Sequence, residues 1–214
     1  GGLNLIFNKN PNVRDTVTLL GALITFYFSA NIFLGFDGQA TQYKLATIMP
    51  GIDISFHIEP LGIVFSLLAS GLWILTHIYA LGYMRGAKEK NHSRFFFFFS
   101  VSIASVMGIS FSGNLFTLFL FYEILTLITF PLVSHKGSNE ALRGARVYLS
   151  ILLGTSIGLQ LLGIIWIYFS VGTLDFVKGG ILNGSFGSLE LSLLVALFAF
   201  GIGKAALFPF HRWL

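Results

Sequence analysis

The chain has 214 residues, of which 55% are hydrophobic and only 10% are charged, with a mean hydropathy of +0.81, whereas ordinary soluble domains are about 25% charged. This composition predicts an integral membrane protein, in which a net charge of +4 belongs to the loops and indicates no nucleic-acid partner. The absence of cysteine excludes thiol catalysis and a thiolate-bound iron–sulfur cluster in this chain.

Six apolar stretches approach the length of about 20 residues that a helix needs to cross the hydrocarbon core. We predict spans at Thr16–Phe36, Leu61–Met84, Phe95–Phe111, Leu115–Ser134, Val147–Ser170 and Leu191–Phe208. Gly1–Asn8 is too short to cross and does not begin with Met, so we interpret it as the end of an earlier span. The predicted fold class is all-α: a polytopic transmembrane helix bundle of six full spans plus a partial first helix, with residues 1–214 as a single transmembrane domain.

Basic residues are concentrated in alternate connections between these spans. The linkers Lys9–Asp15, Arg85–Arg94 and Lys136–Arg146 contain nine of the 13 Lys and Arg residues. The intervening connections, Asp37–Pro60, Ser112–Asn114 and Val171–Glu190, contain only Lys44 and Lys178 and also carry acidic residues. Because Lys and Arg are enriched in loops that are not translocated, this bias predicts that the first set lies on the cytoplasmic, matrix or stromal side.

Two ionisable residues of opposite sign lie deep inside predicted spans, Glu123 and Lys204. A charged residue near the bilayer centre costs about 2.5–3.5 kcal/mol on insertion scales, so each needs a reason to be there. One interpretation is a structural ion pair, or side chains that snorkel to the interface. The other is a proton relay, in which a buried lysine keeps or loses its proton according to the position of a nearby carboxylate.

Pro209 lies five residues after Lys204 and removes a backbone donor, so we expect the last helix to be discontinuous near Pro209. Gly201 and Gly203 weaken the helix in the same region. Broken helices recur at the ion sites of transporters, although many prolines in membrane helices are only kinks.

Four further residues are weaker candidates for proton transfer. They are His77, which lies within a span and is equally compatible with a structural hydrogen bond; His135 and Lys136, at the predicted cytoplasmic end of the Glu123 helix; and His211, which follows the expected break and equally fits a membrane-interface position beside Trp213. Gly154 and Gly158 form a GxxxG pattern, for which close helix packing is the preferred role.

The sequence contains no phosphate loop, no cluster of metal ligands and no nucleophile arrangement. We therefore expect no cofactor, no metal site and no catalytic chemistry belonging to this chain alone.

Three segments together resemble the antiporter-like proton-translocating subunits shared by respiratory complex I (NADH:quinone oxidoreductase), membrane-bound hydrogenases and Mrp-type Na+/H+ antiporters. They are "GYMRG" with its basic loop, "ISFSGNLFTLFLFYEILTLITFPLV" and "GIGKAALFPFHRWL". The resemblance extends over essentially the whole chain, which looks like the N-terminal half of a longer subunit. Tyr122 stands where the complex I subunits commonly have tryptophan, which makes the Glu123 segment more similar to the Mrp type.

The resemblance implies that Glu123 and Lys204 form the pair whose opening and closing moves a proton. It also implies partners: the lipid bilayer, other membrane subunits of an antiporter or redox complex, protons and, in an antiporter, Na+. The expected location is a bacterial or archaeal cytoplasmic membrane. The remaining alternatives are a non-transporting structural subunit, in which the Glu123–Lys204 pair only fixes helix packing, and a membrane enzyme acting on lipid or quinone at the acidic cluster of Asp53 and Glu59.

Overall fold

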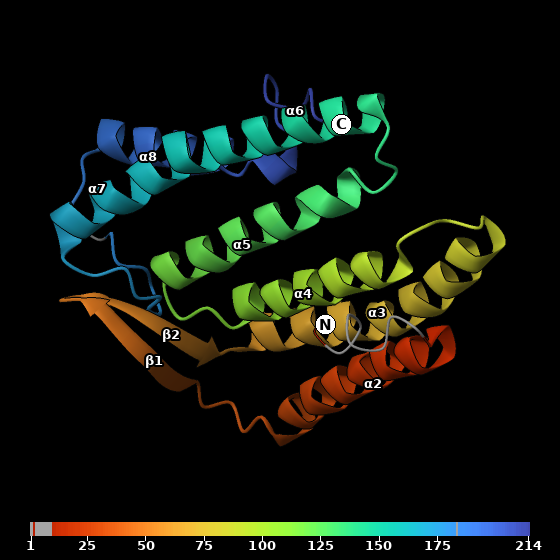
Figure 1. Cartoon of the computed structure of the whole chain (residues 1–214). Helices are drawn as coiled ribbons and strands as arrows, with labels where there is room; N and C mark the ends of the chain where they lie inside the picture. Colours follow the sequence, from red (N-terminus) through yellow and green to blue (C-terminus); the bar gives the residue numbers. More distant parts are fainter. Residues whose placement is uncertain (1, 3–9, 183) are drawn as a thin grey trace. The chain divides into compact units, whose positions relative to one another are not determined.

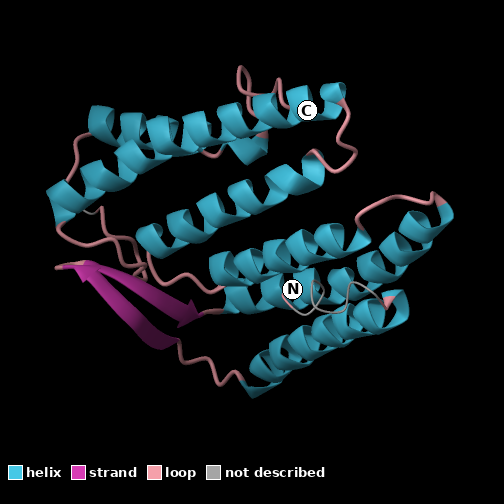
Figure 2. Cartoon of the chain, in the orientation of Figure 1, coloured by secondary structure: helices cyan, strands magenta, loops and turns pink. Residues whose placement is uncertain are grey.

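The computed structural model describes residue 2, residues 10–182 and residues 184–214. The predicted end of an earlier span, Gly1–Asn8, falls almost entirely outside these residues. Within them the chain is mostly helical (Figures 1 and 2), and five helices are long and apolar enough to cross a membrane. The chain divides into two compact units, residues 1–41 with 58–111 and residues 42–57 with 112–214, which are described separately below. A single transmembrane domain over residues 1–214 therefore stays a prediction.

The first unit contains three of the five spans, each close to a predicted one. They are α2 (Pro11–Gly35), α3 (Pro60–Gly86) and α4 (His92–Ser110). Pro11 and Pro60 stand in the first turn of their helices, where a missing N–H costs nothing and the fixed φ favours the helix. The first helix therefore begins five residues before the predicted Thr16.

Small and polar side chains make up much of the interior of this unit, beside a few large apolar ones. The buried face of α3 repeats at helical spacing and consists of Ile63, Ser66, Ser70, Trp73, His77, Ala80 and Met84. Gly62 lies so close to Ser110 that a Cβ there would collide with the Ser110 backbone carbonyl. Such contacts are typical of helices that pack in lipid, where small residues let backbones approach.

The second unit begins with a β-hairpin, which the all-α prediction missed. Its strands are β1 (Thr41–Met49) and β2 (Ile52–Ile58), drawn in magenta in Figure 2. Pro50 and Gly51 form the turn, and Gly51 has a φ of +79°, the conformation that favours glycine. The fold is therefore mostly helical rather than all-α.

The hairpin fixes the start of α5 (Leu115–Val133), the helix that carries Glu123. The Asn114 side chain accepts the Thr117 N–H at 2.7 Å and caps the helix. Its amide nitrogen donates to the Asp53 carbonyl and to the Ser55 hydroxyl, each at 2.8 Å. The first turn of α5 is thereby held against β2.

The next helical stretch, Asn139–Val171, is unbroken and contains one wider turn. It consists of α6 (Asn139–Thr155), the π-helical turn η1 (Ser156–Gln160) and α7 (Leu161–Val171). Figure 1 shows α8 (Ser188–Gly201) alongside this stretch. Leu194 of α8 packs with Ile164 and Ile167 of α7 in a buried apolar cluster.

The last predicted span, Leu191–Phe208, is wrong in its length and in the place of its break. The helix α8 has only 14 residues and ends at Gly201, eight residues before Pro209. A single 3-10 turn, η2 (Gly203–Ala205), carries Lys204, and Ala206 has a positive φ of 52°. The glycines at 201 and 203 therefore mark the break, because they combine low helix propensity with a close contact to the neighbouring helix.

Candidate functional site

Glu123 lies in the middle of α5, in the second unit. Both of its carboxyl oxygens are buried, and neither has a hydrogen-bond partner among the described residues. Ser156 and Lys204 are close enough to interact with it electrostatically. The Ser156 hydroxyl, however, donates to the Leu152 carbonyl at 2.8 Å. The carboxyl group of Glu123 is therefore enclosed by protein without a committed partner.

Lys204 lies in the same unit, and its ammonium group rests against α5. The Nζ atom donates to the Thr126 hydroxyl and lies 3.4 Å from the Tyr122 carbonyl oxygen. It also stands 3.6 Å from the centroid of the Tyr122 ring, a distance suited to a cation–π contact. Tyr122 is 7% exposed and Thr126 is 0% exposed, so Lys204, which is itself partly buried, makes these contacts with buried residues.

The predicted partners thus occupy one site, but the lysine is not bonded to the glutamate. Glu123 is not among the hydrogen-bond partners of Lys204. The contacts of the ammonium group are neutral oxygens and an aromatic ring. A closed Glu123–Lys204 ion pair therefore stays a prediction, and this structure has the side chains in an unpaired arrangement.

Two residues that hold the Lys204 segment, Tyr122 and Trp213, were not identified from sequence as parts of the site. The Tyr122 hydroxyl accepts the Lys204 backbone N–H at 3.2 Å. The indole nitrogen of Trp213 donates to the Gly203 carbonyl at 3.0 Å. A Cβ at Gly201 would lie 2.6 Å from the Gln160 nitrogen. In the sequence, Tyr122 precedes Glu123 and Trp213 lies close to His211, but only the fold brings them to the end of α8.

His77 lies in the first unit, within a buried charged cluster. Its Nε2 is 3.2 Å from the Asp15 carbonyl, and its side chain is fully buried. Arg14 and Arg85 both contact the Asp15 carboxylate, and Arg14 also donates to Ser93 at 3.3 Å. The sequence placed Arg14 and Asp15 in a loop, whereas both are buried in the first turns of α2.

The other weaker candidates do not converge on Lys204. His135 and Lys136 lie in the turn after α5, and Lys136 is exposed. His211 is exposed and stacks on Phe208, with the ring centroids 5.6 Å apart. A role for any of the three in proton transfer stays a prediction.

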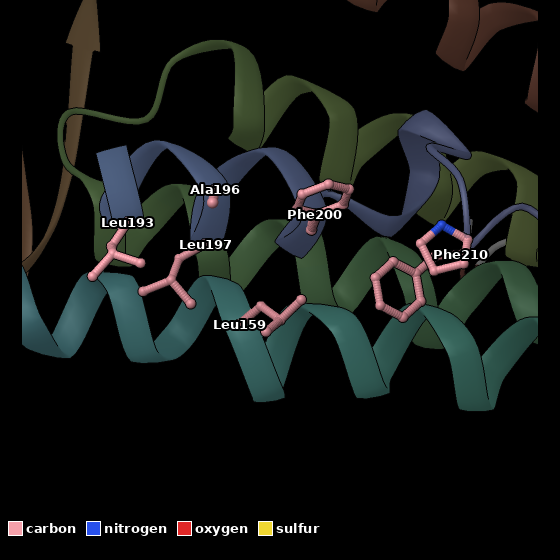
Figure 3. Close-up of a pocket in the computed structure, with 7 residues that line it drawn as sticks. Leu159, Leu193, Ala196, Leu197, Phe200 and Phe210 are labelled. Atoms are coloured by element: carbon pink, nitrogen blue, oxygen red, sulfur yellow. The ribbon is translucent and has the colours of Figure 1, made fainter. Parts of the chain in front are cut away.

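A groove of about 350 Å³ lies beside α8 and extends to Pro209 and Phe210 beyond the break. Figure 3 shows the side chains of α8, of Leu159 and of Phe210 around it. The lining is entirely apolar: Leu159, Leu193, Ala196, Leu197, Phe200, Pro209 and Phe210. Such a lining offers no group that accepts or donates a proton, so this groove is not part of the ionisable site.

Two family profiles match the chain. Residues 112–214, which include Glu123 and Lys204, match the profile described as "NADH:quinone oxidoreductase/Mrp antiporter, TM". Residues 49–96 match the profile described as "NADH-Ubiquinone oxidoreductase (complex I), chain 5 N-terminus".

Similar proteins are antiporter subunits and respiratory subunits. The chain is 31% identical over 199 residues to the antiporter subunit mnhA2 of Staphylococcus haemolyticus, with 90% of this chain and 24% of that protein covered. It is 27% identical over 220 residues to NADH-quinone oxidoreductase subunit L of Neisseria meningitidis, with 93% and 32% covered. The chain thus spans about a quarter to a third of the length of these relatives.

The fold also resembles a chain in the structure of the membrane-bound sulfane sulfur reductase, described as an archaeal respiratory membrane complex. The TM-score is 0.80 at 20% identity, with 98% of this chain and 43% of that chain covered. Together with the two family profiles and the five apolar helices, these similarities identify the chain as an integral membrane protein of the antiporter-like subunit family that is shared by NADH:quinone oxidoreductases and Mrp antiporters.

Proposed function

We propose that the chain forms part of an antiporter-like subunit that translocates protons across a membrane, and that Lys204 and Glu123 are the groups that hold the proton. The observation that carries the proposal is the Lys204 ammonium group, which is partly buried against α5 without a carboxylate partner while an unpartnered carboxyl group lies in the same unit. A permanent structural ion pair would be expected to close.

The proposed mechanism uses the difference between an open and a closed arrangement. When Lys204 faces Glu123, the carboxylate favours the protonated amine. When the two are apart, the amine gives up its proton more readily, because burial disfavours the charged form. Movement of the Lys204 side chain toward Glu123 and away from it would then load and release a proton.

We also propose the neighbouring subunits, the membrane orientation and the exchanged ion of this site. Similar chains belong to multisubunit membrane complexes, so we expect neighbouring membrane subunits and a driving reaction outside this chain. The basic linkers Lys9–Asp15, Arg85–Arg94 and Lys136–Arg146 are expected on the cytoplasmic side of a bacterial or archaeal membrane. In an Mrp-type assembly, Na+ would be exchanged for protons.

The test is Lys204→Ala in the full-length protein, purified with the subunits that accompany it and reconstituted into vesicles. The expected result is loss of coupled proton movement with normal assembly. The matched control is Lys178→Ala, since Lys178 is an exposed lysine in a loop of the same unit. Wild-type transport by Lys204→Ala would refute the proposal.

The structural alternative makes the opposite prediction for a double change. If the charges served only to fix helix packing, Lys204→Met combined with Glu123→Leu would be neutral or stabilising, with transport unchanged. Under the proposed function the same variant assembles and does not transport.

A further inference from the structure

Lys204 reaches α5 through a set of contacts that do not include Glu123. The set comprises the Tyr122 ring, the Tyr122 carbonyl and the Thr126 hydroxyl, and we call it the α5 cage. We propose that the α5 cage is a second binding position for the protonated Lys204 side chain, which competes with Glu123 for the ammonium group. This inference rests on the proposed function and adds two residues, Tyr122 and Thr126, that position the proton carrier.

The hydrogen bonds of the cage fit a cation. The Thr126 hydroxyl donates its one proton to the Tyr122 carbonyl at 2.9 Å. Its lone pairs are therefore the part that faces Lys204, and they can only accept. The ring face of Tyr122 carries the negative lobe of the aromatic quadrupole and attracts an ammonium group more strongly than a neutral amine.

The helical geometry separates the cage from the carboxyl group. Tyr122 and Thr126 are four residues apart and share one face of α5, whereas Glu123 is displaced from Tyr122 by about 100° around the helix axis. A flexible lysine side chain on an adjacent segment can therefore bind either the α5 cage or the Glu123 carboxyl group. The buried, unpartnered oxygens of Glu123 show that the position at the carboxyl group is not filled here.

The backbone of the lysine segment is held independently of the side chain. Lys204 lies beyond the end of α8, and the Tyr122 hydroxyl accepts its backbone N–H at 3.2 Å. On the other side, Trp213 donates to the Gly203 carbonyl. Because the main chain is fixed at both points, a change between the two positions requires only rotation of the Lys204 side chain.

The titratable groups around Lys204 in this unit are Tyr122 and Glu123 of α5, together with Tyr148 of α6, which acts on Tyr122. The η1 turn and the last turn of α8 contain no titratable side chain. A change in the pH profile caused by altering the cage would therefore act through Lys204 and Glu123.

The test is Thr126→Val in the full-length protein, assayed for proton transport in vesicles across a range of pH. Removal of one oxygen that accepts from the ammonium group lowers its affinity for the proton, so the midpoint of the rate–pH profile should move down by about one unit. Thr126→Ser should restore the wild-type midpoint. Thr76→Val is the matched control, because the Thr76 hydroxyl also donates to its own helix but is exposed.

A second variant separates a purely structural role from the proposed one. Tyr122→Phe keeps the ring and the carbonyl but removes the acceptor of the Lys204 N–H. It should lower stability and leave the midpoint in place. If Thr126→Val does not accumulate, Thr126→Ala removes the same oxygen and gives the same expected shift.

An unchanged midpoint in Thr126→Val and Thr126→Ala, or an equal shift in Thr126→Val and Tyr122→Phe, would refute the proposed role of the α5 cage. Failure of the proposed function is seen separately, as wild-type transport by Lys204→Ala. The α5 cage can thus be refuted while the proton-carrying role of Lys204 stands.

Discussion

Gly201→Ala should destabilise the protein by driving the end of α8 away from η1. The new Cβ would lie 2.6 Å from the Gln160 nitrogen, 2.7 Å from its Cβ and 2.9 Å from its Cα. Carbon atoms in ordinary contact are about 3.5 Å apart or more, so two backbones would have to separate by several tenths of an ångström. Overpacking of this kind costs about 1–3 kcal/mol, and the better helix propensity of alanine returns about 1 kcal/mol. We expect a net loss of up to about 2 kcal/mol.

Gly158→Ala is the matched control, since a Cβ there meets no atom within 4 Å among the described residues. It should leave the free energy of unfolding unchanged or raise it by up to about 1 kcal/mol. The assay is thermal unfolding of the full-length protein in mild detergent, followed by the loss of the monodisperse peak in gel filtration. A midpoint for Gly201→Ala that equals or exceeds the midpoint of Gly158→Ala would contradict the close packing of α8 on η1.

Two further predictions concern charges outside the site. Asp15→Asn should cost about 3–5 kcal/mol, because it leaves the 4%-exposed Arg14 without its buried carboxylate. Arg85→Ala should cost at most about 1 kcal/mol, because the Arg85 side chain is 49% exposed. Equal shifts in the unfolding temperature of the two variants would contradict this ranking. In the hairpin, the hydrogen bond from Lys44 lowers the pKa of Asp53, so the carboxylate stabilises the strands above the unfolded value of about 3.9 and this contribution is lost as the pH falls through the lower folded value. Amide exchange in β1 and β2 should accelerate over that range in the wild type, and a matching acceleration in Asp53→Asn would show that Asp53 is not responsible.

Hydropathy was sufficient to predict the long helices, because a run of about 20 apolar residues has few alternatives to a span. Hydropathy was misleading at both ends of the chain: the first predicted span began too late, and the last one, Leu191–Phe208, extended beyond the end of α8 at Gly201. Arg14 and Asp15 were excluded from the first span as charged residues, yet they pair with each other and are buried within α2. Sequence patterns reveal a charge but not the partner that compensates for it.

The hairpin was missed because the connection Asp37–Pro60 contains no long apolar run. A local signal was present: Pro50 and Gly51 separate two segments with strand-forming residues, and this dipeptide suits a tight turn. The GxxxG pattern, in contrast, predicted close helix packing that the described residues do not make. Neither Gly154 nor Gly158 has an atom within 4 Å of the position of a Cβ in the part of the chain that the structure describes.

The candidate site was predictable in its ionisable residues and not in their contacts. Two opposite charges in different spans suggest a pair, and Glu123 and Lys204 do lie in one unit. The binding of Lys204 to Tyr122 and Thr126 depends on the rotation of α5 and on the break at Gly201. Both are set by packing between segments distant in sequence, which propensities do not encode.

The hydrogen bond from Trp213 to the Gly203 carbonyl gives the protein an optical reporter beside its proton carrier. The chain contains three tryptophans, and the other two, Trp73 and Trp166, lie on α3 and α7. With both replaced by phenylalanine, the indole emission would come from Trp213 alone among the residues of this chain. A change in its wavelength during transport would then record the change in position of the nearby Lys204 side chain in real time, without an attached dye.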